Sequence, residues 1–122
     1  MFALDVSSRA VQRARIKCPD ADFFVGDIFS EKVDALAPFD LVVASEVLYY
    51  MRDVPAALRR IQMLGRYNLV TYFSGEFANL DPYVLSVPAV ASEMLELGHA
   101  RWRAAWWAGS AVNSNDTLPR LD

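Results

Sequence analysis

The feature that most constrains this chain is an apolar run that stops abruptly at polar residues. Residues 41–44 are all apolar, and Ser45 and Glu46 follow them directly. The run lacks the alternation of a half-wetted strand, which predicts a strand covered on both faces, as in the parallel sheets of α/β proteins. Ligands of such sheets bind beyond the carboxyl ends of the strands. The sequence therefore predicts a small-molecule site at Ser45, Glu46, Tyr49 and Tyr50.

Chain length and composition indicate one small folded domain. The 122 residues are 54% apolar and 22% charged, which favours a globular protein but is short for a complete doubly wound enzyme. The apolar surplus is expected in the core or on a surface that needs a partner, a missing segment or a dimer mate. The net charge of −3 argues against nucleic acid as the main ligand, because phosphate binding needs clustered positive charge.

Cysteine and histidine usage excludes several kinds of site. The single cysteine, Cys18, rules out an internal disulfide and fits a reducing compartment, and we interpret it as a helix-end residue. The one histidine, His99, is expected at a helix end. With one histidine, one cysteine and scattered acids, no metal site is predicted. No stretch approaches about 18 consecutive apolar residues. We therefore expect a soluble, cytoplasmic protein without a membrane partner.

Strand and helix patterns alternate along the chain, which predicts an α/β fold. A helix capped by either Ser7 or Ser8 is expected to end before Pro19, and a short helix is expected within residues 30–38. Another is expected between Asp53, which resembles a cap, and Gly65, where a left-handed residue would end it. Ser86 or Pro88 is expected to open a last helix that Gly98 ends. The expected strands are residues 1–4, 22–25, 39–44, 67–73 and 101–107, with a weak sixth at 116–121.

Three acids, Asp5, Asp27 and Glu46, end successive predicted strands. A carboxylate can accept hydrogen bonds from both hydroxyls of a ribose, and another can accept from an adenine amino group. Each acid alone is a weak signal, because aspartate is common in turns for local reasons. Their order along the chain indicates a nucleoside site.

These segments give the chain a family resemblance. Through residues 3–7 with 10–15, 26–28 and 39–50, it resembles the class I S-adenosylmethionine-dependent methyltransferases, and the likeness covers about residues 1–73. Within that superfamily, residues 45–50, 93–95 and 115–116 are similar to the nodulation protein S family, N-methyltransferases that act on an amino-sugar oligosaccharide. The resemblance implies a Rossmann-like fold, a mostly parallel sheet with helices on both faces. Residues 1–122 would be a single partial methyltransferase domain.

The resemblance also implies roles for individual residues. Asp5, with Val6 beside it, would accept from the ribose hydroxyls of S-adenosylmethionine, and Asp27 would accept from the adenine amino group with Ile28 beside the ring. The methionine part would lie against Ser45, Glu46 and Val47. Glu46 and Tyr49 would be the catalytic residues, closest to the reaction. For an amine acceptor, Glu46 would orient the nitrogen or take its proton.

One expected motif of the family is absent. The family has an earlier strand and a glycine-rich turn before the strand that ends at Asp5, and none of the five glycines here forms such a turn. By resemblance, the first strand and helix are missing. That strand would lie between the strands ending at Asp5 and Glu46, so we expect altered pairing or two open sheet edges. Marginal stability, or a homo-oligomer formed through an exposed edge, would follow.

Three functional hypotheses remain. The leading one is methyl transfer to a small-molecule acceptor, such as an amine on a sugar. The second is a non-catalytic remnant or interaction module that pairs through its exposed edge or its tryptophan surface. The third is a nicotinamide-dependent Rossmann enzyme in which Asp5 holds the ribose, which residues 45–50 disfavour. The tryptophans at 102, 106 and 107 are expected in the core rather than in an acceptor or sugar pocket.

Overall fold

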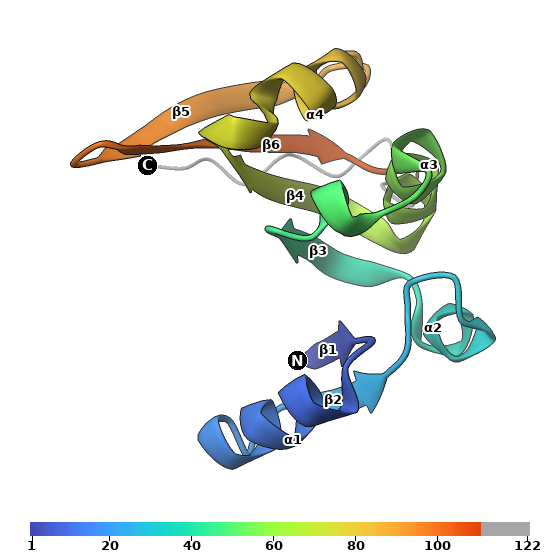
Figure 1. Cartoon of the computed structure of the whole chain (residues 1–122). Coiled ribbons are helices and arrows are strands. Elements are labelled where there is room, and N and C mark those ends of the chain that lie inside the picture. Colours follow the sequence, from blue (N-terminus) through green and yellow to red (C-terminus); the bar gives the residue numbers. More distant parts are fainter. Residues whose placement is uncertain (111–122) are drawn as a thin grey trace. The chain divides into compact units, whose positions relative to one another are not determined.

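The structure, a computed structural model, describes residues 1–110 of the chain (Figure 1). Its backbone contacts divide the chain into two compact units. Unit 1 comprises residues 1–35 and unit 2 begins at residue 36. Each unit is described by itself below.

Unit 1 is built on two short parallel strands. β1 (Phe2–Asp5) and β2 (Asp22–Val25) pair in a register that aligns Asp5 with Val25, and α1 (Ser8–Lys17) connects them. Of the two serines that the sequence offers as a cap, Ser7 caps α1, because its side chain accepts a hydrogen bond from the Ala10 amide. Cys18 caps the other end of this helix. The short helix α2 (Glu31–Leu36) follows β2.

Unit 2 contains a four-stranded mixed sheet with the order β3-β4-β6-β5. β3 (Phe39–Ser45) pairs parallel with β4 (Gly65–Phe73), whereas β6 (Ala100–Ala108) is antiparallel to both β4 and β5 (Ala91–Leu97). The helical elements of the unit are the 3-10 turns η1 (Leu48–Tyr50) and η2 (Ser74–Glu76) and the helices α3 (Val54–Leu64) and α4 (Phe77–Val84).

The core of unit 2 lies between these helices and alternate residues of the central strands. Asp53 caps α3 by accepting from the Ala56 amide at 2.9 Å. Gly65 ends the helix as predicted, but in an extended conformation rather than a left-handed one, because it also begins β4. The buried residues of this core include Ala57, Leu58, Ile61, Leu64, Asn68, Val70, Tyr72, Leu80, Val84, Ala105 and Trp107.

The prediction of cover on both faces of β3 is wrong for two of its residues. Ala44 is 8% exposed, but Leu41 and Val43 are 55% and 54% exposed. An apolar run shows that a strand can be covered on both faces, and the cover itself must come from other segments. The α/β prediction is confirmed. The prediction of a mostly parallel sheet holds for β1 with β2 and β3 with β4, and fails for β5 and β6.

The helix expected between Ser86 and Gly98 is also wrong, because most of that stretch forms β5. Gly98 has a φ of 61° and forms with His99 the two-residue turn of a hairpin, so His99 ends no helix. The helix of this region is α4, which accommodates Pro82 near its end. The strand expected at residues 116–121 lies outside the described residues.

Both strands that flank the expected missing strand have open edges within the described residues. β1 pairs only with β2, and β3 pairs only with β4. The expectation of two open sheet edges is therefore met. Among the described helices, none is long and apolar enough to span a membrane.

Candidate functional site

In unit 1, the carboxyl ends of both strands carry an aspartate. The Gly26 amide donates to the Asp5 carbonyl at 3.0 Å, which joins the two strand ends. Asp5 Oδ1 accepts from the Ser7 amide and Asp27 Oδ1 accepts from the Phe29 amide, each at 2.8 Å. These local bonds fix the orientation of each carboxylate and use one of its two oxygens. The predicted pair of acids is therefore brought together at one edge of the sheet.

The two apolar residues predicted beside these acids follow them directly in the chain. Val6 is 75% exposed, and Ile28 is half-buried. An exposed valine next to a fixed carboxylate is a surface that an apolar or aromatic ligand group can cover. The structure thus places the unit 1 half of the predicted set in one short edge of the sheet.

In unit 2, Glu46 follows β3 in an unusual backbone conformation. Its φ is 56°, a left-handed value that is strained for a residue with a Cβ. Its amide donates to the Thr71 carbonyl at 3.0 Å, so β4 holds this turn in place. The Glu46 Oε2 atom is buried and has no hydrogen-bond partner in the structure. Strained residues and unpaired buried polar atoms occur preferentially where a ligand is bound.

Ser45 and Val47 flank Glu46 at the same strand end. The hydroxyls of Ser45 and Thr71 are 3.0 Å apart and hydrogen-bonded. Val47 is 38% exposed. The site predicted from the end of β3 therefore also includes the end of the parallel neighbour β4, through Thr71.

An aromatic cluster adjoins Glu46. Leu48, which is fully buried, anchors η1, and the next residue, Tyr49, packs 4.6 Å from the Tyr50 ring and edge-on to the Phe73 ring at 5.4 Å, measured between centroids. Desolvation raises the pKa of the Tyr49 phenol, and the negative charge of Glu46 raises it further. Tyr49 is therefore protonated at neutral pH and can donate a hydrogen bond.

The sequence interpretation missed Thr71 and Phe73, together with Glu76, whose charge also acts on Tyr49. Thr71 and Phe73 end the strand predicted at residues 67–73. The rule that selected Ser45 and Glu46, that ligands lie beyond the carboxyl ends of parallel strands, would have selected these two as well.

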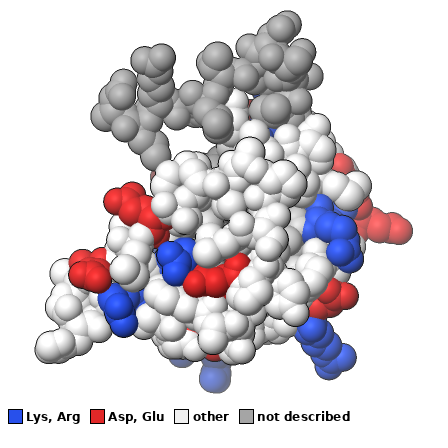
Figure 2. Space-filling model, turned by 90° about the horizontal axis from the view of Figure 1, so that it is seen from above, with Lys and Arg blue, Asp and Glu red and all other residues white. Residues whose placement is uncertain are grey.

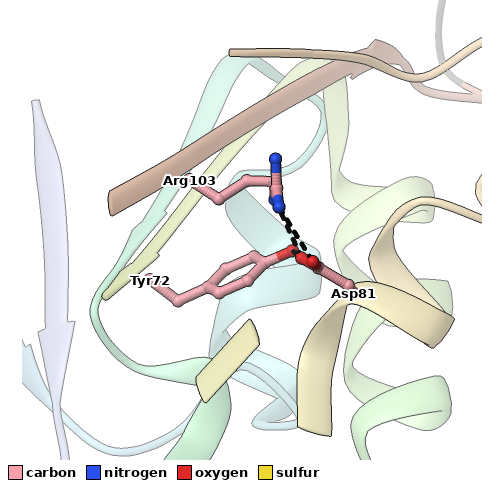
Figure 3. A network of polar contacts seen from close by, with 3 residues as sticks. All are labelled: Tyr72, Asp81 and Arg103. Carbon is pink, nitrogen blue, oxygen red and sulfur yellow. Dashed lines mark hydrogen bonds and ion pairs between the residues drawn. The ribbon is translucent and has the colours of Figure 1, made fainter. Parts of the chain in front are cut away.

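A second polar cluster links β4, β6 and α4 (Figure 3). Asp81 Oδ1 accepts from the Tyr72 hydroxyl at 2.6 Å and from Arg103 Nε at 2.9 Å, and Asp81 Oδ2 accepts from Arg103 Nη2 at 2.9 Å. The guanidinium also lies 4.5 Å from the centroid of the Phe77 ring. Each charge in this cluster has a partner, so we interpret it as a structural link.

Surface charge and metal ligands give no further site in the described part of the chain. On the face in Figure 2, acidic and basic side chains are interspersed, without a basic patch. Residues 1–110 contain no group of three or more His, Cys, Asp or Glu side chains able to hold a metal ion.

Solved methyltransferase structures share this fold. The N-terminal domain of EvdMO1 with SAH bound has a TM-score of 0.63 at 10% identity, over 88% of this chain and 64% of that one. The METTL16 MTase domain has a TM-score of 0.63 at 14% identity, over 88% and 49%. A methyltransferase from Geobacter sulfurreducens has a TM-score of 0.62 at 12% identity, over 89% and 58%. The chain thus spans less than two thirds of each of these proteins.

No curated protein sequence matches the chain. A family model described as a methyltransferase domain matches residues 1–66, more than half of the chain. This match contains Asp5 and Asp27 of unit 1 and the whole of the segment from β3 to α3. The chain therefore belongs to the methyltransferase domain family.

Proposed function

We propose that this chain takes part in S-adenosylmethionine-dependent methyl transfer to an amine of a small molecule, such as an amino sugar. The observation that carries the proposal is the buried, unpaired Glu46 oxygen beside the Tyr49 ring. A carboxylate in this state needs a hydrogen-bond donor, and an amine supplies one. Family membership supports methyl transfer over the nicotinamide-dependent alternative.

The unit 1 residues fit the nucleoside part of the cofactor. Asp5 and Asp27 each direct one oxygen to a backbone amide, which leaves the other as an acceptor for a ribose hydroxyl or an adenine amino group. Val6 and Ile28 offer apolar surface beside them. We assign these four residues to nucleoside binding, and SAH in the EvdMO1 domain supports the choice of cofactor.

The unit 2 residues fit the reacting end. S-adenosylmethionine supplies a methyl group on a positively charged sulfur. Glu46 orients the acceptor nitrogen and accepts the proton that this nitrogen loses. Tyr49 donates a hydrogen bond from its phenol, and its ring, packed against Phe73, helps exclude water from the reacting atoms. Ser45 and Val47 complete the wall near the methionine part.

The amino-sugar acceptor and the closeness to the nodulation protein S family rest on the sequence resemblance of residues 45–50 together with the chemistry of Glu46. Glucosamine is therefore the first acceptor to test. N-acetylglucosamine is its matched control, because acetylation delocalises the lone pair of the same nitrogen into the carbonyl and so removes its basicity and nucleophilicity.

A second candidate function is a non-catalytic module. The open edges of β1 and β3 favour it, since each can pair with another strand. Cofactor binding distinguishes the two candidates.

Calorimetry with S-adenosylmethionine and with SAH is the deciding experiment. We expect binding by the natural chain, and an affinity weaker by about 10- to 100-fold in Asp27→Asn, which keeps the acceptor for the Phe29 amide but loses the charge. Asp22→Asn, at the opposite end of β2, is the matched control and should bind normally. Absence of heat with the folded natural chain would reject the enzyme proposal for this chain and leave the module.

A further inference from the structure

We propose that β5 pairs with β5 of a second copy of this chain, antiparallel and with Met94 on the twofold axis. The two four-stranded sheets would then join into one continuous sheet. This inference concerns unit 2 only and does not depend on cofactor binding.

The outer edge of β5 carries no further strand in the part of the chain that the structure describes. Within the described residues β5 pairs only with β6, and all seven of its residues are exposed. Edge strands usually avoid association through short length, charged side chains (lysine above all), proline or a bulge. β5 contains no proline or lysine, its charged residues are Glu93 and Glu96, and its register with β6 runs without interruption from Ala91 to Leu97. An edge of this kind is suited to strand addition.

The hairpin register determines which backbone groups face outward. A two-residue turn, Gly98-His99, joins Leu97 to its partner Ala100, and such a turn is closed by a hydrogen-bonded pair. Hydrogen-bonded and non-hydrogen-bonded pairs alternate in an antiparallel ladder. Ala91, Glu93, Leu95 and Leu97 therefore bond to β6. Ser92, Met94 and Glu96 direct their amides and carbonyls to the open edge.

This outward set is self-complementary. With Met94 opposite its own copy, Ser92 lies opposite Glu96 of the second copy and Glu96 lies opposite Ser92, so all three outward residues form hydrogen-bonded pairs. Each such pair exchanges two backbone hydrogen bonds. The serine hydroxyl can also donate to the glutamate across the interface.

Other twofold registers are less favourable. An axis at Glu96 places two like charges directly opposite each other, which destabilises a strand pair, and an axis at Ser92 leaves Glu96 unpaired. With the axis at Met94, the other acid of the strand, Glu93, lies opposite Leu95. Of these three registers, the one with Met94 on the axis forms the most backbone hydrogen bonds and places no like charges opposite each other.

Apolar side chains on β5 gain cover in this arrangement. Met94 and Leu95, on opposite faces of the strand, are each 45% exposed, and Leu97 is 77% exposed. Met94 meets its own copy on one face, and Leu97 meets Ala91 on the other. The supporting strand is rigidly held, because Arg103, the β6 partner of Met94, is bound to Asp81 of α4 (Figure 3).

Cysteine crosslinking tests both the partner and the register. In a Cys18→Ser background, Met94→Cys places two thiols opposite each other at the axis, so oxidation should give a covalent dimer. Ser92→Cys is the matched control on the same face and edge. Its two thiols would lie four residues apart along the ladder, so it should not crosslink. Crosslinking of Ser92→Cys instead would overturn the proposed register.

Light scattering after gel filtration tests the association itself. We expect the natural chain to have twice the monomer mass at high concentration and Met94→Pro to have the monomer mass. Proline at position 94 lacks the amide hydrogen that would bond to the second copy, and it leaves the backbone hydrogen bonds between β5 and β6 intact. Circular dichroism checks that the variant is folded. A monomeric natural chain, or a dimer that persists in the folded Met94→Pro variant, would overturn the proposal.

Discussion

Replacing Glu46 with glycine should stabilise unit 2 and abolish the methyl transfer proposed above. Two features of Glu46 lower the stability of the free protein: its left-handed φ of 56° and its buried, unpaired Oε2. Glycine adopts this backbone conformation without strain and removes the carboxylate. The bond from the residue 46 amide to the Thr71 carbonyl is retained.

The expected gain is about 1.5–2 kcal/mol in the free energy of unfolding. A left-handed residue with a Cβ costs about 1–2 kcal/mol, of which about 0.5–1 is offset by the greater freedom of glycine in the unfolded chain. Leaving a buried polar atom unpaired costs about 1–3 kcal/mol. We take the lower end, about 1 kcal/mol, because Glu46 as a whole is only partly buried.

Ala89 provides a matched control for the backbone contribution. It has a φ of 58° and lies on the surface of the same unit, before β5. Ala89→Gly should therefore gain only the net backbone part, about 0.5–1 kcal/mol. Glu46→Gln keeps the strain and removes the charge, so its stability should lie between those of the natural chain and Glu46→Gly.

Urea unfolding followed by tryptophan fluorescence reports on unit 2 alone. All three tryptophans of the chain lie in β6, and both substituted positions belong to this unit. The difference between Glu46→Gly and Ala89→Gly measures the cost of the carboxylate. If Glu46→Gly is no more stable than Ala89→Gly, the buried oxygen costs nothing and the argument for a missing ligand at Glu46 is refuted.

Three further predictions concern the packing of unit 2. Burial raises the pKa of the Tyr72 phenol, and its hydrogen bond to Asp81 raises it further, so this stabilisation is complete below the unfolded-state pKa of about 10 and is lost at higher pH. The urea midpoint of the natural chain should fall more than that of Tyr72→Phe between pH 9 and 11, and parallel curves would contradict this. The buried Trp107 indole donates to Gln62 at 2.6 Å, so Gln62→Leu should cost about 1–3 kcal/mol in urea unfolding, whereas a neutral result would mean that the indole finds another partner. Thr71→Val, which removes the hydroxyl bonded to Ser45, should lower stability by less than about 1 kcal/mol because the pair is exposed, and a much larger loss would show that this hydroxyl also supports the Glu46 turn.

Local signals explain the parts of the fold that the sequence predicted well. The caps at Ser7 and Asp53 act on amides three residues ahead, and both helices begin where the caps place them. The acids at Asp5 and Asp27 are held by bonds to residues two positions further on. Interactions of such short range depend on adjacent residues, so they can be inferred without the tertiary structure.

Long-range pairing explains the parts that were missed. Apolar residues between 87 and 95 fit helical spacing, but this segment becomes β5 because β6 pairs with it over its whole length. Leu41 and Val43 form a strand as predicted, but whether a strand face is covered depends on other elements. Thr71 and Phe73 reach the site only through the pairing of β3 with β4. β3 and β4 are separated in the sequence by α3, and β5 meets β6 close in sequence only at the Gly98-His99 turn, so most of these partners lie far from the residue they act on.

Glu46 combines two features that a residue selected for stability alone would lack. A turn chosen for stability alone would have glycine or asparagine at a φ of 56°, and a buried carboxylate would have a partner. The chain instead combines a strained backbone with an unpaired oxygen at one residue, at the end of the strand where α/β proteins bind ligands. Two independent costs at one position are difficult to explain by packing. A hydrogen-bond donor bound at Oε2 would remove the cost of the unpaired oxygen. An amine that binds there should therefore raise the free energy of unfolding of the natural chain and leave that of Glu46→Gly unchanged.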